Sequence, residues 1–286
     1  MRKVLVLDFD GTMTDAEKEG GPYRTGYLED VSALSGLPLD EVKTLATQFD
    51  TEVAQNPHEY GWEFNGQIVA PAVVDPYLRM MPVARKIFDY SQTFLNTDDR
   101  TRILDGILYK YNYPKTLNCF REGARAVLES FEGSATYVVT NSHTDPVRSK
   151  LKSLGTNDDQ SCSLEWLVER VHGSAKKYVI DNAFTEVDES MELKDLPRPI
   201  LLRRANYYRV LAKILADEKA SFEDLVVVGD IFELDLSLPF ALGARVGILA
   251  NDFTPEYEKN FLDGHPRGAV LSRVQEIPAF AFGDAI

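Results

Sequence analysis

Short apolar runs recur along the chain and predict buried strands. The first covers residues 4–7, and others lie at residues 135–139, 225–228 and 244–249. Each is continuous rather than alternating, and polar or glycine residues bound it. Strands that are apolar on both faces are typical of parallel sheets covered by helices on each side.

Helical periodicity fills the intervals between these runs. It precedes the second and third runs, at Ala124, Val127, Leu128 and Phe131 and at Tyr207, Val210, Leu211 and Ile214. Alternating strands and helices predict an α/β fold with a doubly wound parallel sheet. Residues 155–199 are expected to be largely irregular, with a strand near residues 178–180.

The pattern changes between the first two strands. Apolar residues there repeat at helical spacing without a core-strand run, as in Val42, Leu45, Ala46, Phe49 and Val53, and again in Ile103, Ile107 and Leu108. The pair Asn65-Gly66 is a candidate for a tight turn. We therefore expect a mainly helical domain at residues 16–115, inserted into an α/β core domain of residues 1–15 and 116–286.

Composition narrows the class of protein. The chain has 286 residues, 44% of them hydrophobic, and we find no apolar run that approaches the roughly 18 to 20 residues of a membrane span. Its start does not resemble a signal peptide, and Cys119 and Cys162 form no metal-binding spacing. These features predict a cytoplasmic protein that does not act at a membrane.

The net charge of -14 disfavours nucleic acid as a partner, because phosphate-backbone binding needs a basic stripe. The net charge does not exclude a small phosphorylated metabolite as a partner, since a bound metal and a few local cations can outweigh the field of the whole protein inside a cleft. The oligomeric state is not readable from the sequence.

The end of the first strand is the strongest chemical signal. Asp8 and Asp10 follow it directly, and Gly11 and Thr12 come next. Two carboxylates about 4 Å apart repel by about 4 kcal/mol at an effective dielectric constant of about 20. A hard cation with oxygen ligands, Mg2+ above all, is the simplest partner for such a pair. An attacking carboxylate beside a proton-transferring one is its simplest purpose.

Two other predicted strands end in polar residues. Thr140 and Asn141 follow the second strand, and Gly229-Asp230 follows the third, with Asp235 shortly after. The carboxyl ends of parallel strands meet at one edge of a sheet, where ligands gather. The alternatives are that Thr140 caps a helix beginning near Asp145, and that Asp235 interacts with a helix dipole.

The order of these motifs along the whole chain resembles that of the haloacid dehalogenase (HAD) superfamily of aspartyl-phosphate hydrolases. The resemblance implies a Rossmann-like core with a helical cap after the first motif. It implies a Mg2+-dependent phosphohydrolase that cleaves a small phosphomonoester through an aspartyl-phosphate intermediate. A sugar-phosphate mutase of the same superfamily and a catalytically inactive phosphate-binding or regulatory module are the alternatives. Dehalogenases and phosphonate-cleaving members characteristically lack an acid at the position of Asp10.

The resemblance assigns a role to each acidic residue. Asp8 would be the nucleophile and a metal ligand. Asp10 would be the general acid and base, and its backbone carbonyl would help to hold the metal. Asp230 would be the remaining metal ligand, with Asp235 in a supporting position. An exposed position is the better expectation for Glu233.

Phosphate binding is expected from residues at the same strand ends. Thr140 would have a catalytic role, donating to a phosphoryl oxygen as charge develops on it, and Gly11, Thr12 and Asn141 would bind phosphate through backbone and side-chain donors.

A basic residue should neutralise the nucleophile and the phosphate. Arg204 is favoured for this catalytic role, with Arg203, Lys176 and Lys177 as the competing candidates.

Overall fold

The structure is a computed structural model that describes residues 3–111 and 117–283. The chain divides into two compact units, one of Met1–Thr14 with Phe120–Ile286 and one of Asp15–Cys119. The boundary expected between residues 115 and 116 lies outside the described residues. Within the described part of the chain, we find no helix with the length and apolar character needed to cross a membrane.

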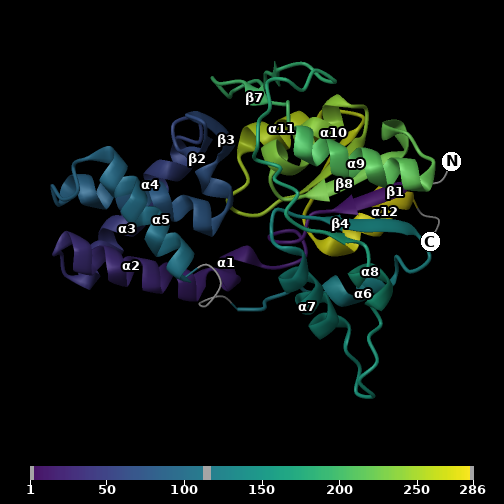
Figure 1. Ribbon diagram of the computed structural model, residues 1–286, viewed down its shortest axis with the longest axis horizontal. Coiled ribbons are helices and arrows are strands. Elements are labelled where there is room, and N and C mark those ends of the chain that lie inside the picture. Colours follow the sequence, from purple (N-terminus) through teal and green to yellow (C-terminus); the bar gives the residue numbers. More distant parts are fainter. Residues whose placement is uncertain (1–2, 112–116, 284–286) are drawn as a thin grey trace. The chain divides into compact units, whose positions relative to one another are not determined.

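The first unit contains a parallel sheet of six strands (Figure 1). Its strands are β1 (Val4–Leu7), β4 (Ala135–Val139), β5 (Val171–His172), β8 (Leu225–Gly229), β9 (Arg245–Leu249) and β10 (Gly268–Leu271). The order across the sheet is β10-β9-β8-β1-β4-β5, and every neighbouring pair is parallel. The expected doubly wound α/β architecture is confirmed.

The outer strands were less predictable than the inner ones. The edge strands β5 and β10 were not expected from the sequence. The strand expected near residues 178–180 was wrong, because a turn and irregular backbone occupy that segment. A turn there brings Lys177 to the end of the sheet.

Helices cover both faces of the sheet because neighbouring residues of each strand point to opposite sides. Val4 and Val6 pack in one core cluster, whereas Leu5 and Leu7 pack in another. The helices of the first cluster are α9 (Ala205–Glu218), α10 (Ser237–Ala241) and α11 (Glu256–Asp263). Those of the second are α6 (Ala124–Glu129), α7 (Thr144–Gly155), α8 (Glu165–Val168) and α12 (Ile277–Phe282). The short elements β6 (Ser190–Met191), β7 (Ile200–Leu201), η2 (Phe222–Asp224), η3 (Phe232–Leu236) and η4 (Val274–Glu276) complete the unit.

The central strand fixes the place of the functional residues. The chain builds β4 and β5 on one side of β1 and then β8, β9 and β10 on the other, so β1 lies at the point where the strand order reverses. Leu7 pairs with Val138 on β4 and with Val228 on β8. The three strands therefore end at the same level, which is where open α/β sheets bind ligands.

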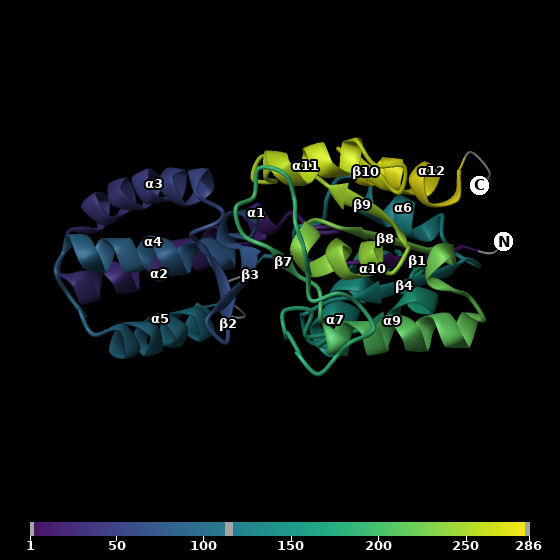
Figure 2. The same cartoon turned by 90° about the horizontal axis from the view of Figure 1, so that it is seen from above.

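The second unit is mainly helical, with one hairpin (Figure 2). Its elements are α1 (Ala16–Glu19), α2 (Gly21–Ser35), α3 (Leu39–Gln55), β2 (Gly61–Phe64), β3 (Gln67–Pro71), η1 (Ala72–Val74), α4 (Pro76–Tyr90) and α5 (Thr97–Tyr111). Asn65 and Gly66 form the turn between β2 and β3, both with positive φ. The stripe that includes Val42, Leu45 and Val53 is buried in this unit's own apolar core.

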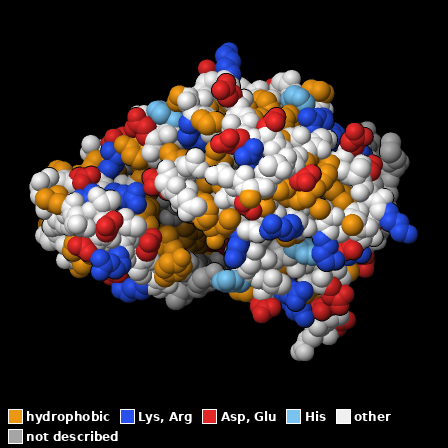
Figure 3. All heavy atoms as spheres, turned by 45° about the horizontal axis from the view of Figure 1, so that its top comes forward, with side chains coloured by type: hydrophobic (Ala, Val, Ile, Leu, Met, Phe, Trp, Pro, Cys, Tyr) orange, Lys and Arg blue, Asp and Glu red, His pale blue; other side chains and the backbone are white. Residues whose placement is uncertain are grey.

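Acidic and basic side chains are interspersed on the face seen in Figure 3. The acidic side chains that give the net charge of -14 are therefore not concentrated in one patch of that face.

Candidate active site

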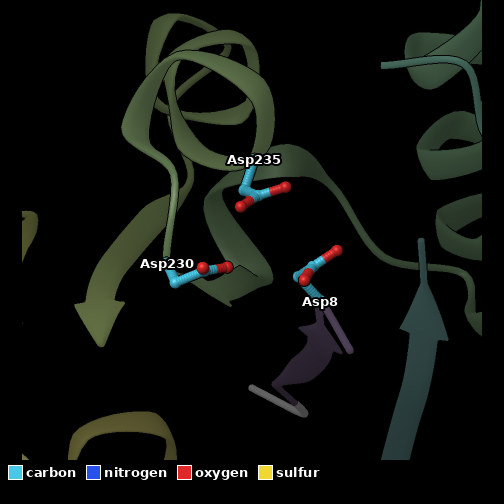
Figure 4. Close-up of side chains that lie close together, drawn as sticks. All are labelled: Asp8, Asp230 and Asp235. Carbon is cyan, nitrogen blue, oxygen red and sulfur yellow. The ribbon is translucent and has the colours of Figure 1, made fainter. Parts of the chain in front are cut away.

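Three carboxylates converge where the central strands end. Asp8 follows β1, Asp230 follows β8, and Asp235 lies on the π-helical turn η3 (Figure 4). One ligand oxygen from each lies within 4.8 Å of the others, and all three residues are buried. Hard divalent cations prefer this type of oxygen donor. The side chain of Asp10 is not part of the group, so its expected metal contact through the backbone carbonyl remains a prediction.

Lys177 supplies the buried cation of this cluster. Its Nζ donates to Oδ1 of Asp8 at 2.7 Å and to Oδ1 of Asp235 at 2.8 Å, and its side chain is 1% exposed. The ammonium also lies 5.3 Å from the centroid of the Tyr207 ring. The basic residue that contacts the candidate nucleophile is therefore Lys177.

The sequence favoured Arg204 over Lys177 for this position, whereas the structure places Lys177 against Asp8. Arg204 is fully buried, but its Nη1 donates to the backbone oxygen of Lys177 at 2.5 Å and its Nε to that of Leu201 at 3.0 Å. Asn141, expected to bind phosphate, accepts from the backbone N–H of Lys177 through its side-chain oxygen at 2.7 Å. Arg204 and Asn141 thus hold the backbone of Lys177 from both sides.

The other two candidate cations lie elsewhere. Lys176 is exposed, and Nη1 of Arg203 donates to the backbone oxygen of Asn182.

The turn after β1 fits closely against the other carboxylates. The Thr12 hydroxyl lies 3.3 Å from Oδ2 of Asp8 and 3.1 Å from Oδ1 of Asp230, so it contacts two members of the cluster. Gly11 has a φ of +82°, and a Cβ at this position would lie 2.0 Å from Oδ2 of Asp230. The close approach of the turn to Asp230 therefore requires glycine.

Asp10 and Thr140 lie beside this cluster. The Thr140 hydroxyl accepts from the backbone N–H of Ser142 at 3.1 Å and lies 3.5 Å from Oδ2 of Asp10. The other carboxylate oxygen of Asp10 accepts from Nζ of Lys150 on α7 at 3.2 Å. Thr140 therefore faces the expected proton-transfer residue, whereas its expected contact with a phosphoryl oxygen remains a prediction.

The electrostatics of the site favour a bound divalent cation. Burial raises the pKa of Asp8 above its ordinary value, although the Lys177 ammonium opposes this shift. Burial acts to lower the pKa of Lys177, but the carboxylates of Asp235 and Asp8 outweigh it and raise that pKa. Three carboxylates and one ammonium leave two negative charges when all are ionised. A buried oxygen cluster with this excess of charge fits Mg2+.

Comparisons with known proteins identify the fold that carries this site. Neither a family model nor a curated protein matches this chain, whereas solved structures resemble its fold. A haloacid dehalogenase-like family hydrolase from Xanthomonas campestris is 12% identical, with a TM-score of 0.50 over 98% of this chain and 96% of its own. The HAD-hydrolase YfnB from Bacillus subtilis, described as bound to magnesium, is 12% identical, with a TM-score of 0.53 over 98% of this chain and 99% of its own. A predicted phosphoglycolate phosphatase from Haemophilus somnus is 15% identical, with a TM-score of 0.52 over 97% and 96%.

This chain has the HAD fold. In the HAD fold of this protein, the motifs quoted from the sequence lie at the ends of β1, β4 and β8. The structural likeness extends over nearly the whole chain, as the order of motifs indicated.

Two residues that support this site of the HAD fold were not predicted from the sequence. Nη2 and Nε of Arg121 donate to the backbone oxygen of Gly11 at 2.6 and 3.0 Å and so hold the turn after β1. Arg121 lies outside any periodic element, and we find no sequence signal for it. Lys150 was detectable in principle, because it lies three residues after the buried Val147 and so on the same side of the helix.

A second acidic pair is buried on the same HAD core. Glu233, expected to be exposed, is fully buried and pairs with both terminal nitrogens of Arg198 at 2.8 and 2.6 Å. Glu258 on α11 is also fully buried, and neither carboxylate oxygen has a hydrogen-bond partner among the described residues. Burial, reinforced by the nearby Glu233, raises the pKa of Glu258 well above its ordinary value of 4.5.

We expect Glu258→Gln to stabilise the protein increasingly as the pH rises. The folded-state pKa of Glu258 is raised, so the stability contributed by its protonated carboxyl group is fully present below pH 4.5. This stability is lost as the pH rises through the folded-state pKa. Each unit of that shift corresponds to about 1.4 kcal/mol. Glutamine cannot ionise, so the variant escapes this loss.

Urea unfolding of the wild type and the variant between pH 4.5 and pH 8 measures the effect. The matched control is Glu256→Gln on the same helix, where the carboxylate is 78% exposed. An equal change in unfolding free energy at all pH values would contradict the raised pKa of Glu258.

Proposed function

We propose that this protein is a Mg2+-dependent phosphohydrolase that cleaves a small phosphomonoester through an aspartyl-phosphate intermediate on Asp8. One observation carries the proposal. Asp8 lies at the end of the central strand with Asp230 and Asp235 in one buried group, and Lys177 donates to its carboxylate. This arrangement offers a nucleophile, a place for a cation and a fixed positive charge within one small volume.

The first half-reaction uses the carboxylate of Asp8 as the nucleophile. An oxygen of Asp8 forms a bond to phosphorus while the bond from phosphorus to the substrate oxygen breaks. Lys177 keeps the Asp8 carboxylate in place and offsets charge on the transferring group. Bound to Asp8 and Asp230, Mg2+ would neutralise charge on these carboxylates and on the phosphoryl oxygens.

Asp10 serves both half-reactions. It first gives a proton to the departing oxygen, and then takes a proton from the water that attacks the aspartyl phosphate. Water attack restores the Asp8 carboxylate and releases inorganic phosphate. Thr140 supports the proposal because its hydroxyl lies beside Asp10 at the end of β4.

The unit of Asp15–Cys119 is proposed to act as the cap. It is inserted in the sequence between Asp10 and Thr140, two of the residues that would meet the substrate. A cap excludes bulk water during phosphoryl transfer and selects substrates by shape. Its own apolar core supports a rigid unit that moves as one body.

A phosphate-release screen over small phosphomonoesters tests the proposed function. With Mg2+, we expect inorganic phosphate to be released from at least one of them. Chelation by EDTA should abolish the release, and added Mg2+ should restore it. Isomerised sugar phosphate without phosphate release would identify a mutase. Phosphate binding without turnover of any ester would indicate an inactive binding module.

A further inference from the structure

Lys150 pairs with Asp10 from a helix that carries none of the acidic cluster. Its Nζ lies 3.2 Å from Oδ1 of Asp10 and 5.8 Å from the centroid of the Phe9 ring. The Lys150 side chain is 18% exposed, and that of Asp10 is 33% exposed. Because the other oxygen of Asp10 faces the Thr140 hydroxyl, both carboxylate oxygens have a neighbour on the core unit.

The helix that carries Lys150 is firmly anchored. Val147 and Leu151 are buried in the apolar core beneath α7, and Nε of Arg148 donates to the backbone oxygen of Val168. At the start of the helix, the Thr144 hydroxyl accepts from the backbone N–H of Gly173. Lys150 therefore extends from a fixed backbone across Phe9 to Asp10.

We propose that Lys150 is a positioning residue that holds the carboxylate of Asp10 for proton transfer. The proposal rests on the phosphohydrolase function argued above. A partly exposed lysine–aspartate pair contributes little to stability, so its main effect should be on the orientation of Asp10.

This role affects some substrates more than others. When the ester bond breaks, the proton of Asp10 passes to the departing oxygen, and the bonding electron pair stays on that oxygen. An alkoxide is a poor leaving group and needs this proton, whereas p-nitrophenolate leaves readily without it. Loss of Lys150 should therefore slow alkyl phosphates more than p-nitrophenyl phosphate.

The test compares Lys150→Met with the wild type on an alkyl phosphate and on p-nitrophenyl phosphate. The quantity measured is kcat/KM, because it reports the steps up to the first irreversible one and excludes the later water attack. We expect kcat/KM for the alkyl phosphate to fall by about tenfold to a hundredfold, which is less than most of the roughly hundredfold to ten-thousandfold contribution of a positioned general acid, because Asp10 itself is retained. For p-nitrophenyl phosphate, the loss should be less than about threefold.

Two further variants separate positioning from general damage. Lys150→Arg should recover most of the activity, since it keeps the positive charge near Asp10. Lys152→Met lies on the same helix, where its side chain is 53% exposed and pairs with Glu165, and should leave both substrates unaffected. Equal losses of Lys150→Met on both substrates, or no loss on either, would overturn the proposal.

Crystal structures of the wild type and of Lys150→Met give a readout that does not need turnover. The Asp10 carboxylate should leave its place beside Thr140 in the variant. An unchanged Asp10 would overturn the positioning role even if the enzyme proves active. A wild type that hydrolyses no ester would count against the phosphohydrolase instead, and the position of Asp10 would still decide the role of Lys150.

Discussion

Replacing Asp8 with asparagine is expected to reduce phosphate release by at least about a thousandfold, because the variant lacks the carboxylate that is proposed to attack phosphorus. The isosteric amide cannot form the acyl phosphate, so no other residue of the site compensates. Incubation with substrate and rapid acid quenching should trap phosphorylated wild-type protein and no phosphorylated variant. Mass spectrometry of the peptide that contains residues 4–12 measures both.

Misfolding is not expected to explain the loss in the Asp8→Asn variant. Burial already disfavours the charged form of Asp8, and Lys177 keeps Asp235 as a partner when the charge of Asp8 is removed. The thermal midpoint should therefore stay equal or rise. Asp263→Asn, at an exposed position on α11, serves as the matched control and should keep full activity. Activity that survives in Asp8→Asn would show that Asp8 is not the nucleophile.

The second large effect concerns Lys177. Lys177→Met removes the ammonium that contacts both Asp8 and Asp235, and leaves buried carboxylates without this cation. We expect the free energy of unfolding to fall by about 3–5 kcal/mol without divalent cations, as when one partner of a buried ion pair is removed. Urea unfolding in EDTA measures the loss.

Added Mg2+ should stabilise Lys177→Met more than it stabilises the wild type, because the variant's carboxylates carry one more uncompensated charge. Above its Kd, each tenfold rise in the Mg2+ concentration increases the free energy of unfolding by about 1.4 kcal/mol.

The neighbouring Lys176 provides the control, since it is exposed and Lys176→Met changes the same type of side chain. Similar losses of stability in both variants would contradict the buried role of Lys177.

The central part of the fold was predictable because its signals are local. Runs such as residues 4–7 and 225–228 are apolar on both faces, which is typical of a parallel sheet covered by helices on each side. Asp8 and Asp230 follow such runs directly, so placing the strands also placed these carboxylates. The edge strand β5 has only two residues and carries no comparable signal.

The choice between Lys177 and Arg204 was not predictable from local signals. Lys176 has a φ of +49° in an irregular loop, and this backbone turn decides which of the two adjacent lysines points inward. No periodic pattern specifies such a turn. Arg204 lies just before a helix, where an inward and an outward guanidinium look alike in sequence, and its partners are backbone oxygens that any residue could supply.

The central position of β1 makes the two units differ in how freely their sequences can change. A strand that is hydrogen-bonded on both sides is among the last segments to lose protection from amide hydrogen exchange. The candidate catalytic residues therefore follow a strand from the most stable part of the sheet. The inserted unit has an apolar core of its own and shares none of this constraint. Under the proposed function, new substrates could be acquired by altering the insert while the reaction itself is left untouched.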